Sequence, residues 1–242
     1  MGTFWQAFIL GGISGFANFL GGLVSFIFPL GKKTLGLVMA FGAGALIASL
    51  SFGLMEEGYW HGGLDATTLG LLAGAGVYYF FHRIFLRHPG PKGLHVRDPA
   101  QQSGVKILAA SVLDGLPEQF AIGVGLQAGS NLGLLVTLGA VLASVPEAIA
   151  GSEKLAPTWG RAKILLFWVA LGIISTLVTV GGYYLAETIP GDFLGFLLAF
   201  AAGSVLAMLA DTMLPEALAH GGSIISIATV AGFLLSYIVS RF

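Results

Sequence analysis

The sequence predicts an all-α integral membrane protein with eight transmembrane helices. Three observations support this fold class. The 242 residues are 56% hydrophobic and only 10% charged, a balance that excludes a disordered chain and is extreme for a soluble domain. Apolar runs of about 20 residues recur along the whole length, each long enough to cross a hydrocarbon core. Two Pro-Glu pairs, Pro117-Glu118 and Pro146-Glu147, lie inside two of these runs, where polar groups are costly and usually functional.

The eight apolar runs are tightly connected and leave little polar sequence between them. The predicted helices cover residues 4–28, 34–55, 64–86, 105–127, 131–154, 162–186, 193–217 and 223–240. Because no basic segment precedes the first run, we expect it to be the first helix and not a cleaved signal peptide. The one loop of any size is 87–103, which three prolines and two glycines make irregular. We therefore predict a single membrane domain over residues 1–242.

The basic residues indicate how these helices are oriented. If the helices alternate in direction, ten of the eleven Lys and Arg residues fall on one side of the membrane: Lys32, Lys33, Arg83, Arg87, Lys92, Arg97, Lys106, Lys154, Arg161 and Lys163. By the positive-inside rule that side is cytoplasmic. Both termini are then extracytoplasmic, and we expect a multi-pass protein of the cell (inner) membrane.

Composition restricts the chemistry further. The chain has no cysteine, so disulfides and thiolate metal sites are excluded. A net charge of −1 indicates no particular macromolecular partner. We expect the lipid bilayer as the surroundings and no nucleic acid.

Two of the predicted helices resemble each other. Residues 41–50 (FGAGALIASL) align with residues 200–209 (FAAGSVLAML), and the same offset places Glu57 opposite Glu216. The predicted topology runs these helices in opposite directions, so the match indicates an inverted repeat that relates helices 1–3 to helices 6–8 around helices 4 and 5. Chance similarity between two small-residue packing faces is the alternative.

The Pro-Glu segments carry a resemblance to a known family. Eight helices, outward termini, a long third loop and Pro-Glu centres in helices 4 and 5 resemble the ZIP (zinc/iron permease) divalent-metal transporters. That family's helix 4 typically reads His-Asn-x-Pro-Glu-Gly, where this chain has Asp114-Gly115-Leu116-Pro117-Glu118-Gln119. Its helix 5 typically reads His/Gln-Asn/Asp/Glu-x-Pro-Glu/His, where this chain has residues 143–147 (ASVPE). The resemblance covers the full chain in topology and implies metal transport and a homodimer.

The departures from the family pattern concern its second metal. Asp114 replaces the family's histidine, Gly115 its asparagine, and Ala143 and Ser144 its polar pair in helix 5. Residues 164–179 contain no carboxylate, although helix 6 supplies a glutamate in many members. The resemblance therefore implies one metal site, made from Asp114, Glu118 and Glu147, and a divergent member whose substrate cannot be carried over from the family.

The same three residues form a plausible site on physical grounds. Asp114 and Glu118 are spaced i, i+4 and share one helix face. Pro117 and Pro146 each free a backbone carbonyl one turn earlier. Three carboxylates in apolar surroundings repel each other, and a divalent cation or protons would remove that cost, so the site could exchange metal for protons. All-oxygen ligands favour Mn²⁺, Mg²⁺ or Fe²⁺, although zinc also accepts carboxylates.

Weaker candidates surround this site. Ser144 could add a hydroxyl oxygen, although membrane serines more often bond to their own helix. Asp211 and Glu216, near the cytoplasmic end of helix 7, could form an exit relay or could be helix-end charges that meet headgroups. Three histidines, His82, His88 and His95, are expected in the cytoplasmic loop region, where they would either be solvated or sense metal.

Transport of divalent metal cations by alternating access is the leading functional hypothesis, with the metal as substrate and no resident cofactor. A transporter of another ion or solute, or a metal sensor that does not transport, remains the alternative, because the second metal site is lost. An enzyme is not expected. Asp114 and Asp211 could be imagined as an aspartyl protease pair, but the Gly-x-Gly-Asp context and any His-Glu-x-x-His motif are absent.

Overall fold

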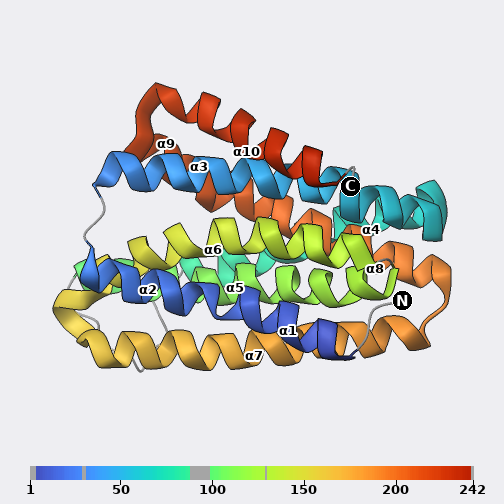
Figure 1. Ribbon diagram of the computed structural model, residues 1–242, viewed down its shortest axis with the longest axis horizontal. Helices are drawn as coiled ribbons and strands as arrows, with labels where there is room; N and C mark the ends of the chain where they lie inside the picture. The colour runs from blue at the N-terminus through green and yellow to red at the C-terminus, as the bar shows by residue number, and fades with distance from the viewer. Residues whose placement is uncertain (1–3, 29–30, 88–98, 129, 241–242) are drawn as a thin grey trace.

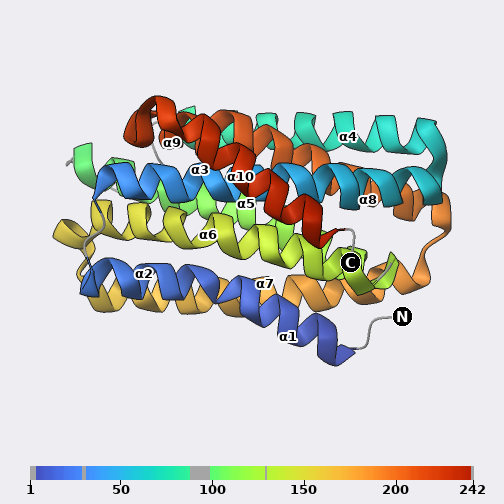
Figure 2. The same ribbon diagram turned by 45° about the horizontal axis from the view of Figure 1, so that its top comes forward.

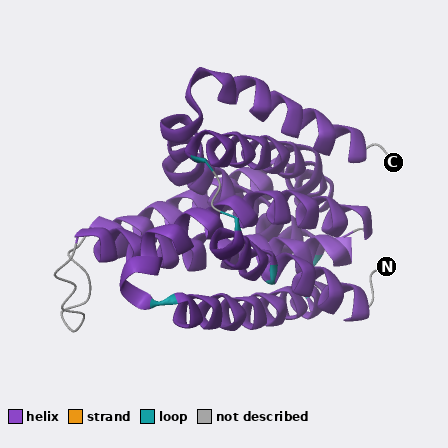
Figure 3. Ribbon diagram, turned by 60° about the vertical axis from the view of Figure 1, so that its left-hand side comes forward, coloured by secondary structure: helices purple, strands orange, loops and turns teal. Residues whose placement is uncertain are grey.

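The computed structural model describes residues 4–28, 31–87, 99–128 and 130–240, and every regular element in them is helical (Figure 3). The elements are α1 (Phe4–Gly15), α2 (Ala17–Ile27), α3 (Lys32–Ser49), the π-helical segment η1 (Leu50–Met55), α4 (Glu56–Arg87), α5 (Pro99–Ala128), α6 (Ser130–Trp159), α7 (Arg161–Thr188), α8 (Gly191–Met208), the π-helical segment η2 (Leu209–Met213), α9 (Leu214–Gly221), the 3₁₀ turn η3 (Gly222–Ile224) and α10 (Ile225–Val239).

Five stretches of the described residues are long and apolar enough to cross a membrane. They are Phe4–Ile27, Lys32–Ile84, Gly133–Pro157, Arg161–Thr188 and Gly191–Val239. Each exceeds the minimum of about 20 residues that an apolar helix needs for one crossing. The chain is therefore a multi-pass, all-helical membrane protein, as the sequence predicted.

Two of these stretches reverse direction at a glycine. The stretch Lys32–Ile84 has 53 residues and Gly191–Val239 has 49, far more than one crossing requires. Gly63 (φ 65°) interrupts the first, and Gly222 (φ 69°) interrupts the second. Left-handed backbone of this kind is readily available only to glycine. Figure 2 shows the chain turning back after α3 into α4 and after α9 into α10.

Three structural features of the two reversing stretches occur at one constant offset. The offset that aligns Lys32 with Gly191, the first residues of α3 and α8, also aligns the first residues of η1 and η2, Leu50 and Leu209. It aligns Gly63 with Gly222 as well. Their packing agrees: a Cβ on Gly36 would overlap the backbone of Gly221, and a Cβ on Gly195 would overlap the backbone of Gly62.

Helices α5 and α6 lie at the centre of the bundle. Figure 2 shows them between a layer of α1, α2 and α7 and a layer formed by α3, α4, α8 and α10. Small residues permit this close packing: a Cβ on Gly21 of α2 would overlap the Val145 carbonyl oxygen, and one on Gly42 of α3 would come within about 2.5 Å of the Leu142 oxygen of α6. The predicted central pair is thus enclosed by other helices.

The described ends of the chain lie at one end of the bundle, on the right in Figure 1. The end of α2, the start of α3 and the α6–α7 connection lie at the opposite end (Figure 1). Residues 88–98 of the predicted loop lie outside the described residues, and residues 99–103 belong to α5. Pro99 is the first residue of that helix, a position where its missing N–H costs nothing.

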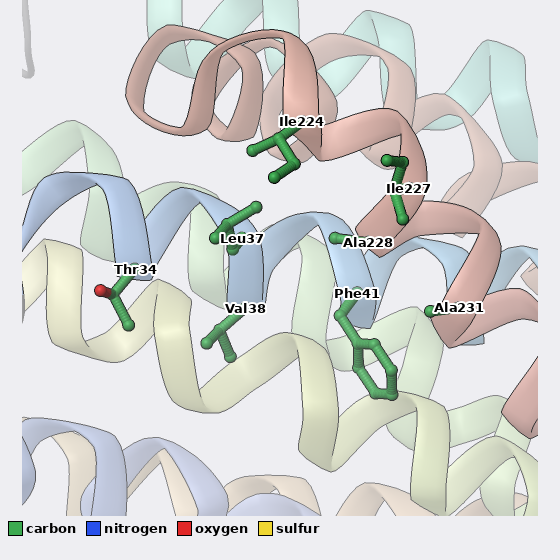
Figure 4. A pocket seen from close by; sticks show the side chains of 8 residues that line it. All are labelled: Thr34, Leu37, Val38, Phe41, Ile224, Ile227, Ala228 and Ala231. Atoms are coloured by element: carbon green, nitrogen blue, oxygen red, sulfur yellow. The ribbon is translucent and has the colours of Figure 1, made fainter.

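One apolar groove of about 410 Å³ opens between α3 and the η3–α10 segment. Its lining includes Leu37, Val38, Phe41, Ile224, Ile227 and Ala231 (Figure 4). At the aligned positions of α8, Phe193 and Phe196 are stacked with ring centroids 5.7 Å apart, and Phe200 follows at 6.3 Å.

Candidate metal site

A direct contact joins the two central helices at a predicted site residue. The Ser111 hydroxyl of α5 donates a hydrogen bond of 2.7 Å to Glu147 Oε1 of α6. Ser111 is 2% exposed, so this bond is shielded from solvent. Pro146, the neighbour of Glu147, lies within the continuous helix α6. The contact sets the register of the two helices and occupies one oxygen of the Glu147 carboxylate.

The second predicted glutamate, Glu118, is buried inside the bundle. Glu118 is only 3% exposed, and its Oε1 has no hydrogen-bond partner among the described residues. The charges of Glu118 and Glu147 are close enough to interact, and the charge of Glu216 also reaches Glu147. A buried carboxylate oxygen without a partner is costly and requires an explanation. A cation that binds there would supply one.

Open space lies on the helix face that carries these groups. Ser111, Gly115 and Glu118 are spaced i, i+4, i+7 on α5 and share one face. A Cβ added to Gly115 would meet no described atom within 4 Å. The room beside Gly115 is therefore flanked by the Ser111–Glu147 contact on one side and by Glu118 on the other.

The other predicted site residues have different surroundings. Asp114 lies on α5, but its side chain is outside the described residues. Ser144 is buried on α6, one turn before Glu147. Glu216 is half-buried on α9, and its backbone oxygen lies 3.0 Å from His220 Nδ1. Among the side chains that the structure describes, no three His, Cys, Asp or Glu residues form a group that could hold a metal, so a three-carboxylate site requires Asp114.

Asp211 lies against α4. Its Oδ2 is 3.6 Å from Nδ1 of His82, whose ring stacks on Tyr78 with centroids 5.5 Å apart. His82 therefore belongs to α4 and packs between helices, which corrects its assignment to the cytoplasmic loop region. His88 and His95 lie outside the described residues. Helix α4 continues through position 82 because the apolar pattern continues there, and a stacked ring satisfies the histidine.

A polar cluster on the adjoining face of α5 holds that helix in place. Gln119 is 3% exposed and donates to Ser14 Oγ of α1 at 2.7 Å. Thr179 of α7 lies 3.0 Å from both the Gln119 side-chain oxygen and its backbone oxygen. These bonds tie α5 to two neighbouring helices. Because Gln119 follows Glu118 directly, they also fix the direction in which Glu118 points.

Sequence reasoning missed Ser111 and Gln119 as parts of the site. Each had a signal that could have found it: Ser111 precedes Glu118 by two helical turns on one face, and Gln119 is a large amide inside an apolar run. The hydroxyls of Ser49 and Ser51 bond to the carbonyl oxygens of Leu46 and Ile47 on their own helix, as membrane serines commonly do.

Comparisons with known proteins bear on the predicted family. The chain is 28% identical over 220 residues to an Arabidopsis thaliana protein named "Putative zinc transporter At3g08650", a match that covers 89% of this chain and 35% of that protein. It is 29% identical over 139 residues to the human protein "Zinc transporter SLC39A7", with 54% of this chain and 30% of that protein covered. The dog SLC39A7 protein matches equally well. SLC39A7 is a ZIP protein.

The predicted resemblance to the ZIP family is confirmed. No protein-family model matches the chain, in keeping with the departures from the ZIP motifs at Asp114, Gly115 and Ser144. The chain spans about a third of the length of these ZIP relatives.

Proposed function

We propose that this chain transports divalent metal cations across a membrane, with the ion held between α5 and α6 by carboxylates of Asp114, Glu118 and Glu147. The observation that carries the proposal is the unpartnered Oε1 of buried Glu118, beside the open space at Gly115. The names of the related proteins support a metal substrate. Zinc is the metal in those names, and Mn²⁺ and Fe²⁺ suit an oxygen-only ligand set equally well.

We further propose eight membrane crossings in the cell (inner) membrane, with both termini extracytoplasmic. The reversals at Gly63 and Gly222 divide two of the five apolar stretches into two crossings each, which gives seven, and α5 would be the eighth. Lys32 and Arg161 begin α3 and α7, and Arg87 ends α4. The starts of α3 and α7 lie at the end of the bundle opposite the described termini (Figure 1), and basic residues mark the cytoplasmic side.

Alternating access would follow from an inverted repeat. Such a repeat would relate the first three predicted helices, within residues 4–86, to the last three, within residues 162–240. It is supported by the aligned π-helical segments and the aligned left-handed glycines. The reciprocal Gly36–Gly221 and Gly195–Gly62 contacts also support it. Two halves with one sequence pattern can exchange conformations, which opens a central site to each side in turn. The site itself stays on α5 and α6.

Glu216 offers a route between the site and the cytoplasmic end. Its charge reaches Glu147, and its backbone oxygen contacts the ring of His220 one turn later. We propose that Glu216 accepts the ion or a proton as Glu147 releases it, and that Asp211 with His82 acts nearer the cytoplasm. Protons that replace the metal on the carboxylates would make the carrier proton-exchanging.

The remaining proposals follow the family. The metal is the substrate, so no resident cofactor is proposed, and no enzymatic activity is proposed either. A homodimer is the proposed assembly, in which the lipid-facing helices of two copies meet. The domain is proposed to extend over residues 1–242 as one unit.

Uptake into proteoliposomes tests the main proposal. Zn²⁺, Mn²⁺, Fe²⁺, Co²⁺, Cd²⁺ and Mg²⁺ are offered in turn to wild type, to Glu118→Gln and to Glu153→Gln, which makes the same change at an exposed position of α6. We expect flux of at least one metal, lost in Glu118→Gln and kept in Glu153→Gln. A folded wild type that moves none of the metals would refute transport, and metal-dependent stabilisation without flux would point to a sensor.

A further inference from the structure

Asn18 lies on the first membrane-spanning stretch, Phe4–Ile27, and carries a buried side-chain amide. The site described above does not include this residue. Its side chain is 7% exposed, and Oδ1 has no hydrogen-bond partner among the described residues. Buried amide oxygens in folded proteins almost always accept a hydrogen bond or bind an ion. An oxygen that lacks a protein partner inside a membrane domain therefore points to a ligand.

The packing of α1 and α2 shows which way Asn18 faces. Ser14, Asn18 and Gly21 are spaced i, i+4, i+7, and the helical hydrogen bonds Phe16 N to Gly12 O (2.9 Å) and Leu20 N to Phe16 O (3.1 Å) continue across the junction of α1 and α2. The three residues therefore share one face. Ser14 contacts Gln119 of α5, and Gly21 packs against Val145 and Ala148 of α6. Asn18, between them, faces the α5–α6 pair.

The same contacts give the depth of Asn18 in the membrane. Gln119, at the level of Ser14, is the neighbour of Glu118. Val145, at the level of Gly21, lies two residues before Glu147. Because α5 and α6 are antiparallel and joined at Ser111 and Glu147, the level of Asn18 falls between the two glutamates. Gly115, with open space at its Cβ position, lies on the stretch of α5 between the same two levels.

We propose that Asn18 supplies its amide oxygen as an additional ligand to the transported divalent cation. This inference rests on the proposed function and deepens it. An amide oxygen is a hard, neutral ligand of the kind that oxygen-binding cations accept. It adds a contact without adding a fourth negative charge to a site that already holds Asp114, Glu118 and Glu147.

Asn18 could be buried because it supports the fold or because it binds the ion, and Asn18→Leu distinguishes these two roles. The substitution keeps the side chain's size and removes its polar atoms. If Asn18 serves the fold, the variant loses thermal stability in the absence of metal. If Asn18 serves the ion, removal of a buried oxygen without a partner leaves the metal-free stability unchanged or higher, and metal affinity falls.

The test uses the purified full-length chain, with thermal unfolding followed across a titration of Zn²⁺ and of Mn²⁺, and with metal uptake measured in proteoliposomes. Wild type is compared with Asn18→Leu, Asn18→Asp and Ser25→Ala. Ser25 is a matched control, because it is buried on the same face of α2 and its hydroxyl already bonds to Gly22 O at 2.7 Å.

We expect Asn18→Leu to weaken metal affinity about tenfold or more, the scale seen when groups around a metal are removed, without a lower metal-free midpoint. Asn18→Asp should bind metal more tightly than wild type, and Ser25→Ala should match wild type. Wild-type affinity in Asn18→Leu overturns the inference alone. If Asn18→Leu does not fold, an Asn18→Asp variant that binds no more tightly than wild type overturns it. A wild type without any metal response overturns the proposed function as well.

Discussion

The hydroxyl of Ser111 donates to Oε1 of Glu147 at 2.7 Å across the α5–α6 interface. This bond holds one oxygen of the Glu147 carboxylate. It also joins the two helices that carry the Pro-Glu pairs, so a shift of one helix along the other would break it. The geometry of the candidate site therefore depends on a serine outside both motifs.

Replacing this serine is the first prediction. Ser111→Ala should lower metal affinity by about tenfold, because Glu147 loses the group that orients it, and should cost about 1 kcal/mol of stability. Metal titrations followed by thermal unfolding measure both. Ser49→Ala is the control, since Ser49 bonds within its own helix. Equal metal affinity in the two variants would show that Ser111 does not position Glu147.

The open space at Gly115 gives a second prediction. A leucine there should fold, because a Cβ meets no described atom within 4 Å, but its side chain should fill the room beside Glu118 and abolish metal uptake. Gly76→Leu makes the same change at an exposed position of α4 that is equally open. Uptake in proteoliposomes distinguishes them, and full uptake by Gly115→Leu would place the ion elsewhere.

The left-handed glycines give a third prediction. Gly63→Ala and Gly222→Ala should each destabilise the protein by about 1–2 kcal/mol, because a side chain disfavours positive φ by that amount. Gly181→Ala, inside α7 and with open space at its Cβ position, should be neutral or slightly stabilising. Denaturant unfolding in detergent provides the comparison. Clearly different losses of stability in Gly63→Ala and Gly222→Ala would argue against the proposed inverted repeat.

The Gln119 cluster gives a fourth prediction. Gln119→Leu removes the amide that donates to Ser14 Oγ, and a buried polar group that loses its partner costs about 1–3 kcal/mol. We expect a lower unfolding midpoint and weaker metal binding, because α5 can then rotate and carry Glu118 with it. Trp168→Phe, which breaks the hydrogen bond to Ser152 between α6 and α7, should lower the midpoint and leave metal affinity intact. If both variants bind metal normally, Gln119 supports the fold alone.

The fold class could be predicted from the sequence because the bilayer imposes it. A long apolar stretch such as residues 162–186 satisfies its backbone hydrogen bonds only as a helix, so composition and length suffice. The Pro-Glu pairs stood out for the same reason, since a carboxylate such as Glu118 is rarely found in apolar surroundings without a function. The offset between residues 41 and 200 was also visible in the sequence, and the inverted repeat that it indicates stays a prediction.

The surroundings of the site depended on tertiary structure. Ser111, Asn18 and Gln119 gain their meaning only from contacts between different helices. Such contacts depend on the rotation and register of each helix, which small residues such as Gly21 set through close packing. His82 was misassigned because a single polar residue near a helix end is compatible with either loop or helix. The sequence alone thus determined the all-helical membrane fold class, through local hydrophobicity. Only the packed bundle decided which polar groups meet, because that follows from contacts between residues far apart in the chain.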